Sequence, residues 1–110
     1  MEDIFKRTLL YDFYGELLTP HQKSIYEEVV YNDMSLGEIA GEFNITRQGV
    51  YDIVKRCDKI LKQYEEKLQL VKRFENARQK LETALGLADR LDKKEGTELK
   101  ELLKEIADCL

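Results

Sequence analysis

Residues 35–57 read SLGEIAGEFNITRQGVYDIVKRC, the pattern of two helices joined by a sharp turn. Ser35, followed three residues later by Glu38, is the reciprocal capping arrangement that begins a helix. Asn44 stands where the chain must turn, because Asn tolerates a left-handed backbone better than most residues with a side chain. Thr46 is suited to cap the next helix. The stretch therefore predicts a helix-turn-helix.

The apolar residues of this stretch have distinct steric roles in the expected motif. Ala40 is small and lets two helices cross closely, and Ile45 fills the turn. Val50 and Ile53 set the apolar face of the second helix against the first, at the angle that lets a helix enter a DNA major groove. The same geometry also serves protein–protein recognition, so the spacing leaves both functions open. Gly49 indicates either a close approach by a partner or crowding within the motif.

Helices are also expected before this stretch. Residues 2–18 carry apolar side chains at spacings of one, three and four, which is typical of an amphipathic helix. Thr19 and Pro20 form an N-cap and first helical residue, so a second helix begins there, and it ends at the Asn32-Asp33 pair.

After Gln48 apolar side chains recur at alternating steps of three and four over more than three heptads. This pattern predicts one long helix or two collinear helices, interrupted at Gly86 or Gly96, with an apolar seam that needs a partner. Thr97–Leu110 repeats the pattern and should fold back after a turn at residues 93–96. We therefore expect an all-α protein with a helix-turn-helix domain over residues 1–64. A helical extension over residues 65–110 then ends in a hairpin that joins two copies as a homodimer.

Composition argues against several functional classes. The 110-residue chain has no apolar run of about 18 residues and no basic-then-apolar start, so we expect neither a membrane span nor a signal peptide. We therefore expect a cytoplasmic protein. Cys57 and Cys109 lack a CxxC partner and His21 is the only histidine, so we expect no metal site and no cofactor. We expect both cysteines to be small apolar fillers. The chain shows no nucleophile–base set and no phosphate loop, so we expect no catalytic residues and no enzyme.

Charge constrains the nucleic-acid hypothesis. The formal net charge is −4, and residues 1–60 hold seven Lys and Arg against eleven Asp and Glu. Nucleic-acid binding would need a local basic stripe, and Asp52 would weaken it. The second helix of the motif offers side chains that suit base edges and phosphates. The candidate nucleic-acid-binding residues are Arg47, Gln48, Tyr51, Asp52, Lys55, Arg56 and Lys59.

The stretch LLYDFYGELLTPHQKSIYEEVVYNDMSLGEIAGEFNITRQGVYDIVKRCDKIL closely resembles the YlxM family of small bacterial helix-turn-helix proteins. The most specific parts are YDFYGELLT at residues 11–19 and ITRQGVYD at residues 45–52. The resemblance implies a helix-turn-helix similar to the promoter-reading C-terminal region of sigma factors, region 4. It also adds Thr46 to the candidate binding residues, and the matching motif positions are Thr46, Arg47, Gln48, Gly49, Val50, Tyr51 and Asp52.

Genes of the family typically neighbour the gene for the signal recognition particle GTPase, so the resemblance implies a regulatory or accessory role in protein targeting. Two partners follow as expectations. One is nucleic acid, either promoter DNA or the RNA of the particle, bound through the helix-turn-helix. The other is the particle GTPase or its receptor, bound as a protein–protein contact without nucleic acid, which the acidic N-terminal half favours.

Overall fold

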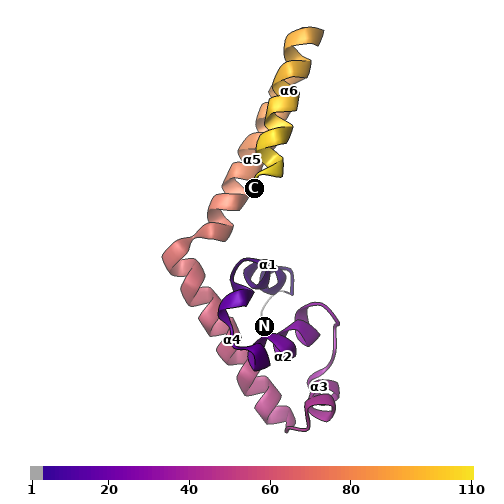
Figure 1. The fold of residues 1–110 in the computed structure, drawn as a ribbon, viewed down its shortest axis with the longest axis vertical. Coiled ribbons are helices and arrows are strands. Elements are labelled where there is room, and N and C mark those ends of the chain that lie inside the picture. Colours follow the sequence, from indigo (N-terminus) through magenta and orange to yellow (C-terminus); the bar gives the residue numbers. More distant parts are fainter. Residues whose placement is uncertain (1–3) are drawn as a thin grey trace. The chain divides into compact units, whose positions relative to one another are not determined.

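A computed structural model describes residues 4–110 of the chain (Figure 1). In this described part all regular structure is helical, with six α-helices and one 3₁₀ turn. The prediction of an all-α fold built on a helix-turn-helix is confirmed. The chain divides into two compact units, an N-terminal unit that ends at Gln69 and a C-terminal hairpin, Leu70–Leu110.

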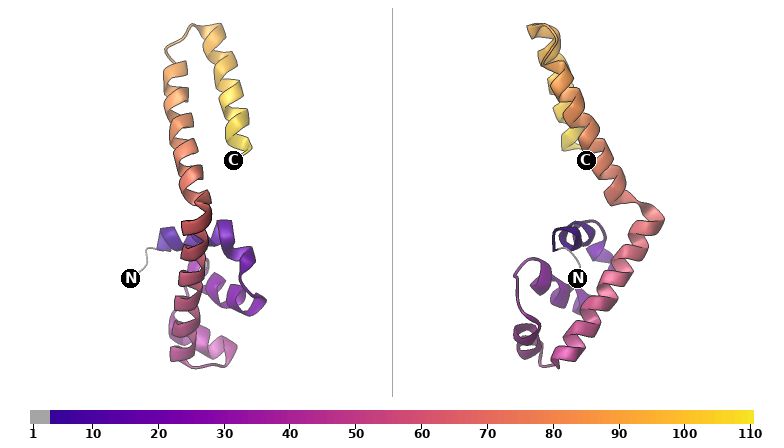
Figure 2. Two further views of the ribbon diagram at one scale, coloured as in Figure 1. Left: turned by 90° about the vertical axis from the view of Figure 1, so that its left-hand side faces the viewer. Right: turned by 180° about the vertical axis from the view of Figure 1, so that it is seen from behind.

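The N-terminal unit is organised around one long helix. This helix, α4, packs against each of the three helices that precede it, and these lie on one side of it (Figures 1 and 2). The elements of the unit are α1 (Ile4–Tyr14), the 3₁₀ turn η1 (Gly15–Leu17), α2 (Pro20–Val30), α3 (Leu36–Phe43) and α4 (Arg47–Leu68). The helix expected over residues 2–18 thus ends at Tyr14, and residues 2 and 3 lie outside the described part.

The expected helix boundaries of the helix-turn-helix are confirmed. Ser35 and Glu38 form a capping box, and the hydrogen bonds from the backbone and side chain of Ser35 hold the pKa of Glu38 below its ordinary value. Asn44 adopts the left-handed conformation, with φ 54° and ψ 46°. The Thr46 hydroxyl accepts a 2.9 Å hydrogen bond from the Gly49 N–H. Thr19 caps α2, with Pro20 at its start.

The core of the N-terminal unit is built on the inner face of α4. Val50, Val54, Cys57 and Leu61 follow at helical spacing and are buried against α1, α2 and α3. The expectation that the apolar seam after Val50 needs an outside partner is therefore wrong for α4, because the preceding helices of the same chain cover it. Tyr14, Ile25, Tyr26 and Ile39 complete this core from the other elements.

The C-terminal hairpin consists of α5 (Leu70–Ala88) and α6 (Lys93–Asp108), which pack side by side (Figure 2). The expected hairpin is confirmed, but its breaks lie elsewhere. Helix α4 ends at Gln69, which is left-handed with φ 54°, and Gly86 lies inside α5. Residues 93–96 form the first turn of α6, which Asp92 caps through a 3.0 Å hydrogen bond from the Glu95 N–H.

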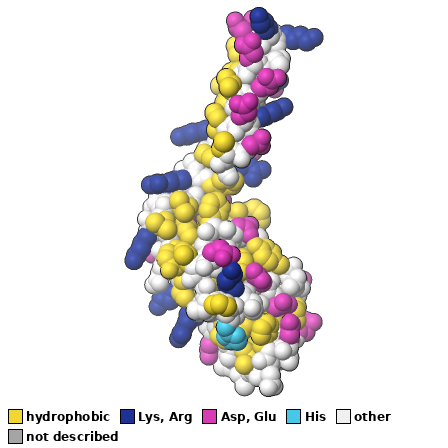
Figure 3. Space-filling view, viewed as in Figure 1, with side chains coloured by type: hydrophobic (Ala, Val, Ile, Leu, Met, Phe, Trp, Pro, Cys, Tyr) yellow, Lys and Arg dark blue, Asp and Glu magenta, His cyan; other side chains and the backbone are white. Residues whose placement is uncertain are grey.

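Gly96 marks a close approach of the two hairpin helices. A Cβ atom at this position would lie 2.8 Å from the carbonyl oxygen of Ala88, so the glycine is needed for packing and does not interrupt the helix. Two helices bury only part of their apolar surface, and Leu87, Leu102 and Ile106 are each at least half exposed. Figure 3 shows such hydrophobic side chains along the hairpin.

The two cysteines differ in environment. Cys57 is fully buried, as expected of an apolar filler, and burial raises the pKa of its thiol to about 11. Cys109 is exposed, so the expectation of a buried filler is wrong there, because α6 ends one residue earlier. Within residues 4–110 no three His, Cys, Asp or Glu side chains gather as metal ligands would, and no helix has the length and apolarity to cross a bilayer.

Candidate nucleic-acid interface

The turn into α4 is fixed by its own residues. Thr46 uses its hydroxyl to cap the helix, so this candidate binding residue has a structural task. A Cβ atom on Gly49 would lie 3.1 Å from that hydroxyl oxygen. Crowding within the cap therefore accounts for Gly49, which was one of the two interpretations of this residue.

Arg47 begins α4 and is exposed. Its guanidinium group passes Gly37 of α3, where a Cβ atom would lie 3.7 Å from Arg47 Nε. The first turn of α4 contains no acidic residue, whereas the first turn of α3 contains Glu38. A cation at a helix N-terminus is opposed by the helix dipole, so Arg47 does not stabilise α4 there. The arrangement suits an incoming phosphate, which both the dipole and the guanidinium attract.

The next turns of α4 hold two pairs of candidate residues. Gln48 Nε2 donates a 2.9 Å hydrogen bond to Asp52 Oδ1. The ammonium group of Lys55 lies 5.5 Å from the centroid of the Tyr51 ring, a cation–π contact. Gln48, Asp52 and Tyr51 are exposed, so both pairs lie at the surface where a ligand can reach them. Asp52 lies in the middle of this face, where a carboxylate opposes phosphate.

Three lysines gather further along the same face. Lys55, Lys59 and Lys62 line a shallow hollow, together with Asp58, Gln63 and Glu66. Lys62 was missed by the sequence analysis, although it lies three residues after Lys59 and seven after Lys55, spacings that share one face of a helix. Lys55, Lys59 and Lys62 are called the lysine row below.

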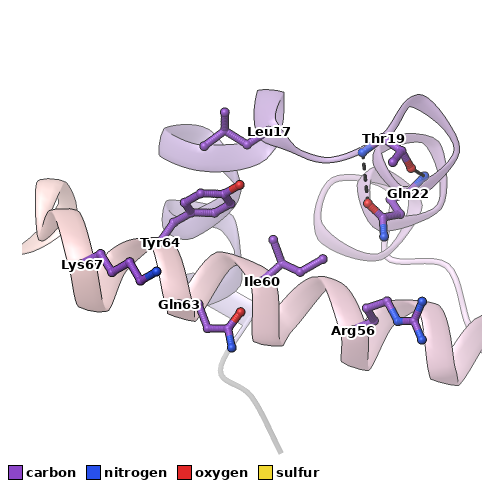
Figure 4. Close-up of a pocket in the computed structure, with 8 residues that line it drawn as sticks. All are labelled: Leu17, Thr19, Gln22, Arg56, Ile60, Gln63, Tyr64 and Lys67. Carbon is purple, nitrogen blue, oxygen red and sulfur yellow. Dashed lines mark hydrogen bonds between the residues drawn. The ribbon is translucent and has the colours of Figure 1, made fainter.

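Arg56 does not belong to this row. It lines a different groove, in which α4 faces η1 and the start of α2 around Thr19 and Gln22 (Figure 4). Successive residues of an α-helix are turned by about 100°, so Lys55 and Arg56 point to different sides. The structure thus divides the predicted basic stripe between two surfaces.

A buried charge network fixes α4 to the helices behind it. Asp58 is 5% exposed, and its carboxylate accepts hydrogen bonds from Arg7 Nε (3.1 Å) and Arg7 Nη2 (2.8 Å). The hydroxyl of Tyr26 donates to Asp58 Oδ1 at 2.5 Å, and burial, followed by this bond, raises the pKa of Tyr26. Asp58 therefore ties α1 and α2 to the part of α4 that carries the lysine row. Sequence reasoning missed this network, since its members are far apart in the chain.

Other tyrosine–carboxylate pairs fix α1 in the same way. Tyr11 donates a 2.7 Å hydrogen bond to Glu27, and Tyr14 donates a 2.5 Å bond to Glu65. Tyr31 donates to Asp12, and desolvation followed by this bond raises the pKa of Tyr31 to about 12. Part of the acidic character of the N-terminal half thus serves to assemble the fold.

The charges of the N-terminal unit are segregated. Residues 1–46 hold nine Asp and Glu against three Lys and Arg, whereas α4 holds six Lys and Arg against four Asp and Glu. Figure 3 shows Lys and Arg side chains along the α4 edge of this unit and Asp and Glu side chains over the preceding helices. The net charge of −4 therefore hides a locally basic helix.

Comparison with known proteins agrees with this motif. The family model described as "Putative helix-turn-helix protein, YlxM / p13 like" matches residues 1–108. The UPF0122 protein of Thermoanaerobacter sp. is 44% identical over 107 residues, which cover 96% of this chain and 92% of that protein. The UPF0122 protein of Caldanaerobacter subterraneus is 54% identical over 74% of this chain and 71% of its own length. That of Geobacillus kaustophilus is 40% identical over 96% of both chains. The chain therefore belongs to the YlxM / p13-like family of helix-turn-helix proteins.

Proposed function

We propose that this protein is a non-enzymatic nucleic-acid-binding protein that acts in the signal recognition particle pathway as a regulatory or accessory factor. The observation that carries the nucleic-acid part is the basic face of α4. Arg47 lies at a helix N-terminus whose first turn holds no acidic residue, and the lysine row begins about two turns further along α4 and spans about two turns itself. The resemblance to YlxM proteins supports the pathway and makes promoter DNA or the particle RNA the expected ligand.

The expected binding mode is mainly electrostatic. Lysines and arginine at this spacing follow a phosphate backbone, while Gln48 and Tyr51 lie where base contacts would be made. Asp52 and the acidic helices α1–α3 oppose phosphate, so we expect modest affinity that falls steeply with salt.

The test is a salt titration of binding to the particle RNA, to a promoter duplex and to a random duplex. Arg47→Ala and Lys59→Gln should each weaken binding and lower the slope of log affinity against log salt by about one. Lys80→Gln, an exposed lysine of α5, is the matched control and should leave both unchanged. Binding that ignores salt and both α4 substitutions would refute the proposal.

A protein–protein function is the second candidate, and the acidic surface of residues 1–46 favours it. Here the partner is the particle GTPase or its receptor. Pull-down of the GTPase that survives nuclease treatment and persists in Arg47→Ala would support this candidate over the first.

We also propose that the C-terminal hairpin pairs two copies. Leu99, Leu102 and Ile106 follow at spacings of three and four on α6 and are 36%, 58% and 50% exposed. Two such hairpins can bury these side chains together as a four-helix bundle. Equilibrium sedimentation should give twice the 13.0 kDa chain mass, and Leu102→Lys should return the monomer. A monomer of the unchanged protein at micromolar concentration would refute this pairing.

A further inference from the structure

A groove of about 540 Å³ lies within the N-terminal unit, where η1 and the start of α2 face α4 (Figure 4). The Thr19–Gln22 capping box borders it, with hydrogen bonds of 3.0 and 3.2 Å. These bonds use Gln22 Oε1 and the Thr19 hydroxyl oxygen as acceptors, so both side chains are held in place at the border of the groove. The groove adjoins the hollow at the lysine row, with Gln63 lining both, but none of the three lysines lines the groove and the proposed nucleic-acid contact does not require it.

Apolar side chains form much of the lining. Leu17 is 54% exposed at the groove, while the next residue, Leu18, is buried. Ile60 and Tyr64 lie opposite, one turn apart on α4 (Figure 4). The ring of Tyr64 stacks on that of the buried Tyr14, with centroids 6.0 Å apart, so this part of the groove is held in place before any ligand arrives.

The charges at the groove are all of one sign. Arg56 and Lys67 are its charged lining residues, and no carboxylate lines it. This stands out in a chain with a net charge of −4. The groove therefore combines an apolar surface with positive charge, and its ligand should combine apolar and acidic groups.

We propose that this groove binds an acidic amphipathic helix of a partner protein. Arg56 and Lys67 are eleven residues apart on α4, which corresponds to about 16 Å, or three helical turns. A helix of that length presents apolar anchors at positions i, i+3 or i+4, and i+7. Its apolar face would cover Leu17, Ile60 and Tyr64, while its carboxylates would meet Arg56 and Lys67 at the two ends.

Nucleic acid fits this groove less well. A phosphate backbone calls for closely repeated cations, whereas the two cations here are separated by apolar side chains. A compact anionic metabolite fits less well too, because it would not span the two cations. The groove length and its charge pattern thus favour a peptide helix.

The test uses fluorescence anisotropy with a labelled helical peptide of about 18 residues, long enough to hold a helix, with leucines along one face and glutamates beside them. A second peptide carries lysine at every glutamate position. The variants of the full chain are Leu17→Asp and Lys67→Glu. Leu87→Asp, on α5 and 55% exposed, is the matched control, because it places the same charge at an equally exposed leucine outside the groove.

The acidic peptide should bind and the basic peptide should not. Leu17→Asp and Lys67→Glu should each weaken binding by about tenfold or more, and Leu87→Asp should not. Absence of binding at about 1 mM acidic peptide, or binding that Leu17→Asp leaves unchanged, would overturn the proposal. So would a change from dimer to monomer in Leu17→Asp, which would assign the groove to a second copy of the chain.

The outcome is separable from that of the nucleic-acid proposal. Leu17→Asp should keep the affinity for RNA or DNA and its salt slope, and Lys59→Gln should keep the affinity for the peptide. Each surface can therefore fail its own test while the other passes.

Discussion

Replacement of Asp58 by asparagine should destabilise the N-terminal unit by about 3 kcal/mol, the lower end of the range for breaking a buried ion pair. The side chains of Asp58 and Arg7 are 6% and 14% exposed. An asparagine can still accept the hydrogen bonds from Tyr26 and Arg7 Nε at its oxygen. Its amide N–H group, however, would face the N–H group of Arg7 Nη2, which now bonds to Asp58 Oδ2 at 2.8 Å. The guanidinium would lose the countercharge of Asp58.

The assay is urea unfolding at neutral pH, followed by tyrosine fluorescence. All six tyrosines lie between residues 11 and 64 and the chain has no tryptophan, so this signal reports on the N-terminal unit alone. The matched control is Lys23→Met, which breaks the Lys23–Glu16 pair. That pair has the same 2.8 Å separation, but the Glu16 side chain is 90% exposed. The control should change stability by less than about 1 kcal/mol.

A double substitution tests the cause. Arg7→Met should cost much less in the Asp58→Asn background than in the unchanged protein, because the ion pair with Asp58 is already lost there. The reasoning is refuted if Asp58→Asn costs less than about 1 kcal/mol, as an exposed pair does, or if the two substitutions simply add.

Three further predictions concern packing and pH. Gly96→Ala should lower the stability of the hairpin, measured by thermal unfolding followed by circular dichroism, because its Cβ would lie 2.8 Å from a backbone oxygen. Gly86→Ala should raise that stability by up to about 1 kcal/mol, because a Cβ there would meet no atom within 4 Å. Gly15→Ala should destabilise the N-terminal unit, because its Cβ would lie 2.7 Å from the buried Tyr11 ring, and Gly41→Ala should not; equal tyrosine-fluorescence midpoints would contradict this. The stability of the N-terminal unit should fall above pH 9, because the pKa of the Cys57 thiol is about 9 in the unfolded chain and about 11 in the folded one. The contribution of the protonated thiol to stability is therefore complete below pH 9 and is lost as the pH rises to 11. Cys57→Ala should reduce the slope of urea midpoint against pH most clearly between pH 9 and 10, because above pH 10 Tyr26 and Tyr31, whose pKa values folding also raises, add to the loss. An unchanged slope between pH 9 and 10 would show that the thiol is not the cause.

Local signals in the sequence predicted the helix-turn-helix well. The caps at Ser35 and Thr46 and the left-handed Asn44 depend on side-chain and backbone groups within a few residues, so their chemistry can be read along the chain. The inner face of α4 was also predicted, because helical spacing identifies apolar positions. The helices that cover that face could not be predicted, because periodicity carries no information about which helix lies opposite.

Other features depend on distant contacts. Asp58 lies among charged neighbours in the sequence, and only the approach of Arg7 and Tyr26 makes it a buried anchor. Gln69 ends α4, although glutamine is a good helix former, so no local signal marked that break. The sequence places Arg56 beside Lys55 and Lys59 on the exposed part of α4. Which neighbouring elements border that part, and so separate Arg56 from the lysines, becomes known only when the helices are packed.

The pairing of α1 with α4 also bears on how the protein is made. Arg7 and Tyr14 each bond to a residue 51 positions later in the chain, so α1 emerges well before α4 during synthesis. Its buried face therefore has no permanent cover until most of α4 has left the ribosome. A truncated chain that stops after α3 would expose that face and should be a substrate for chaperones and proteases. Within this unit α1 is thus translated early and reaches its final neighbours late.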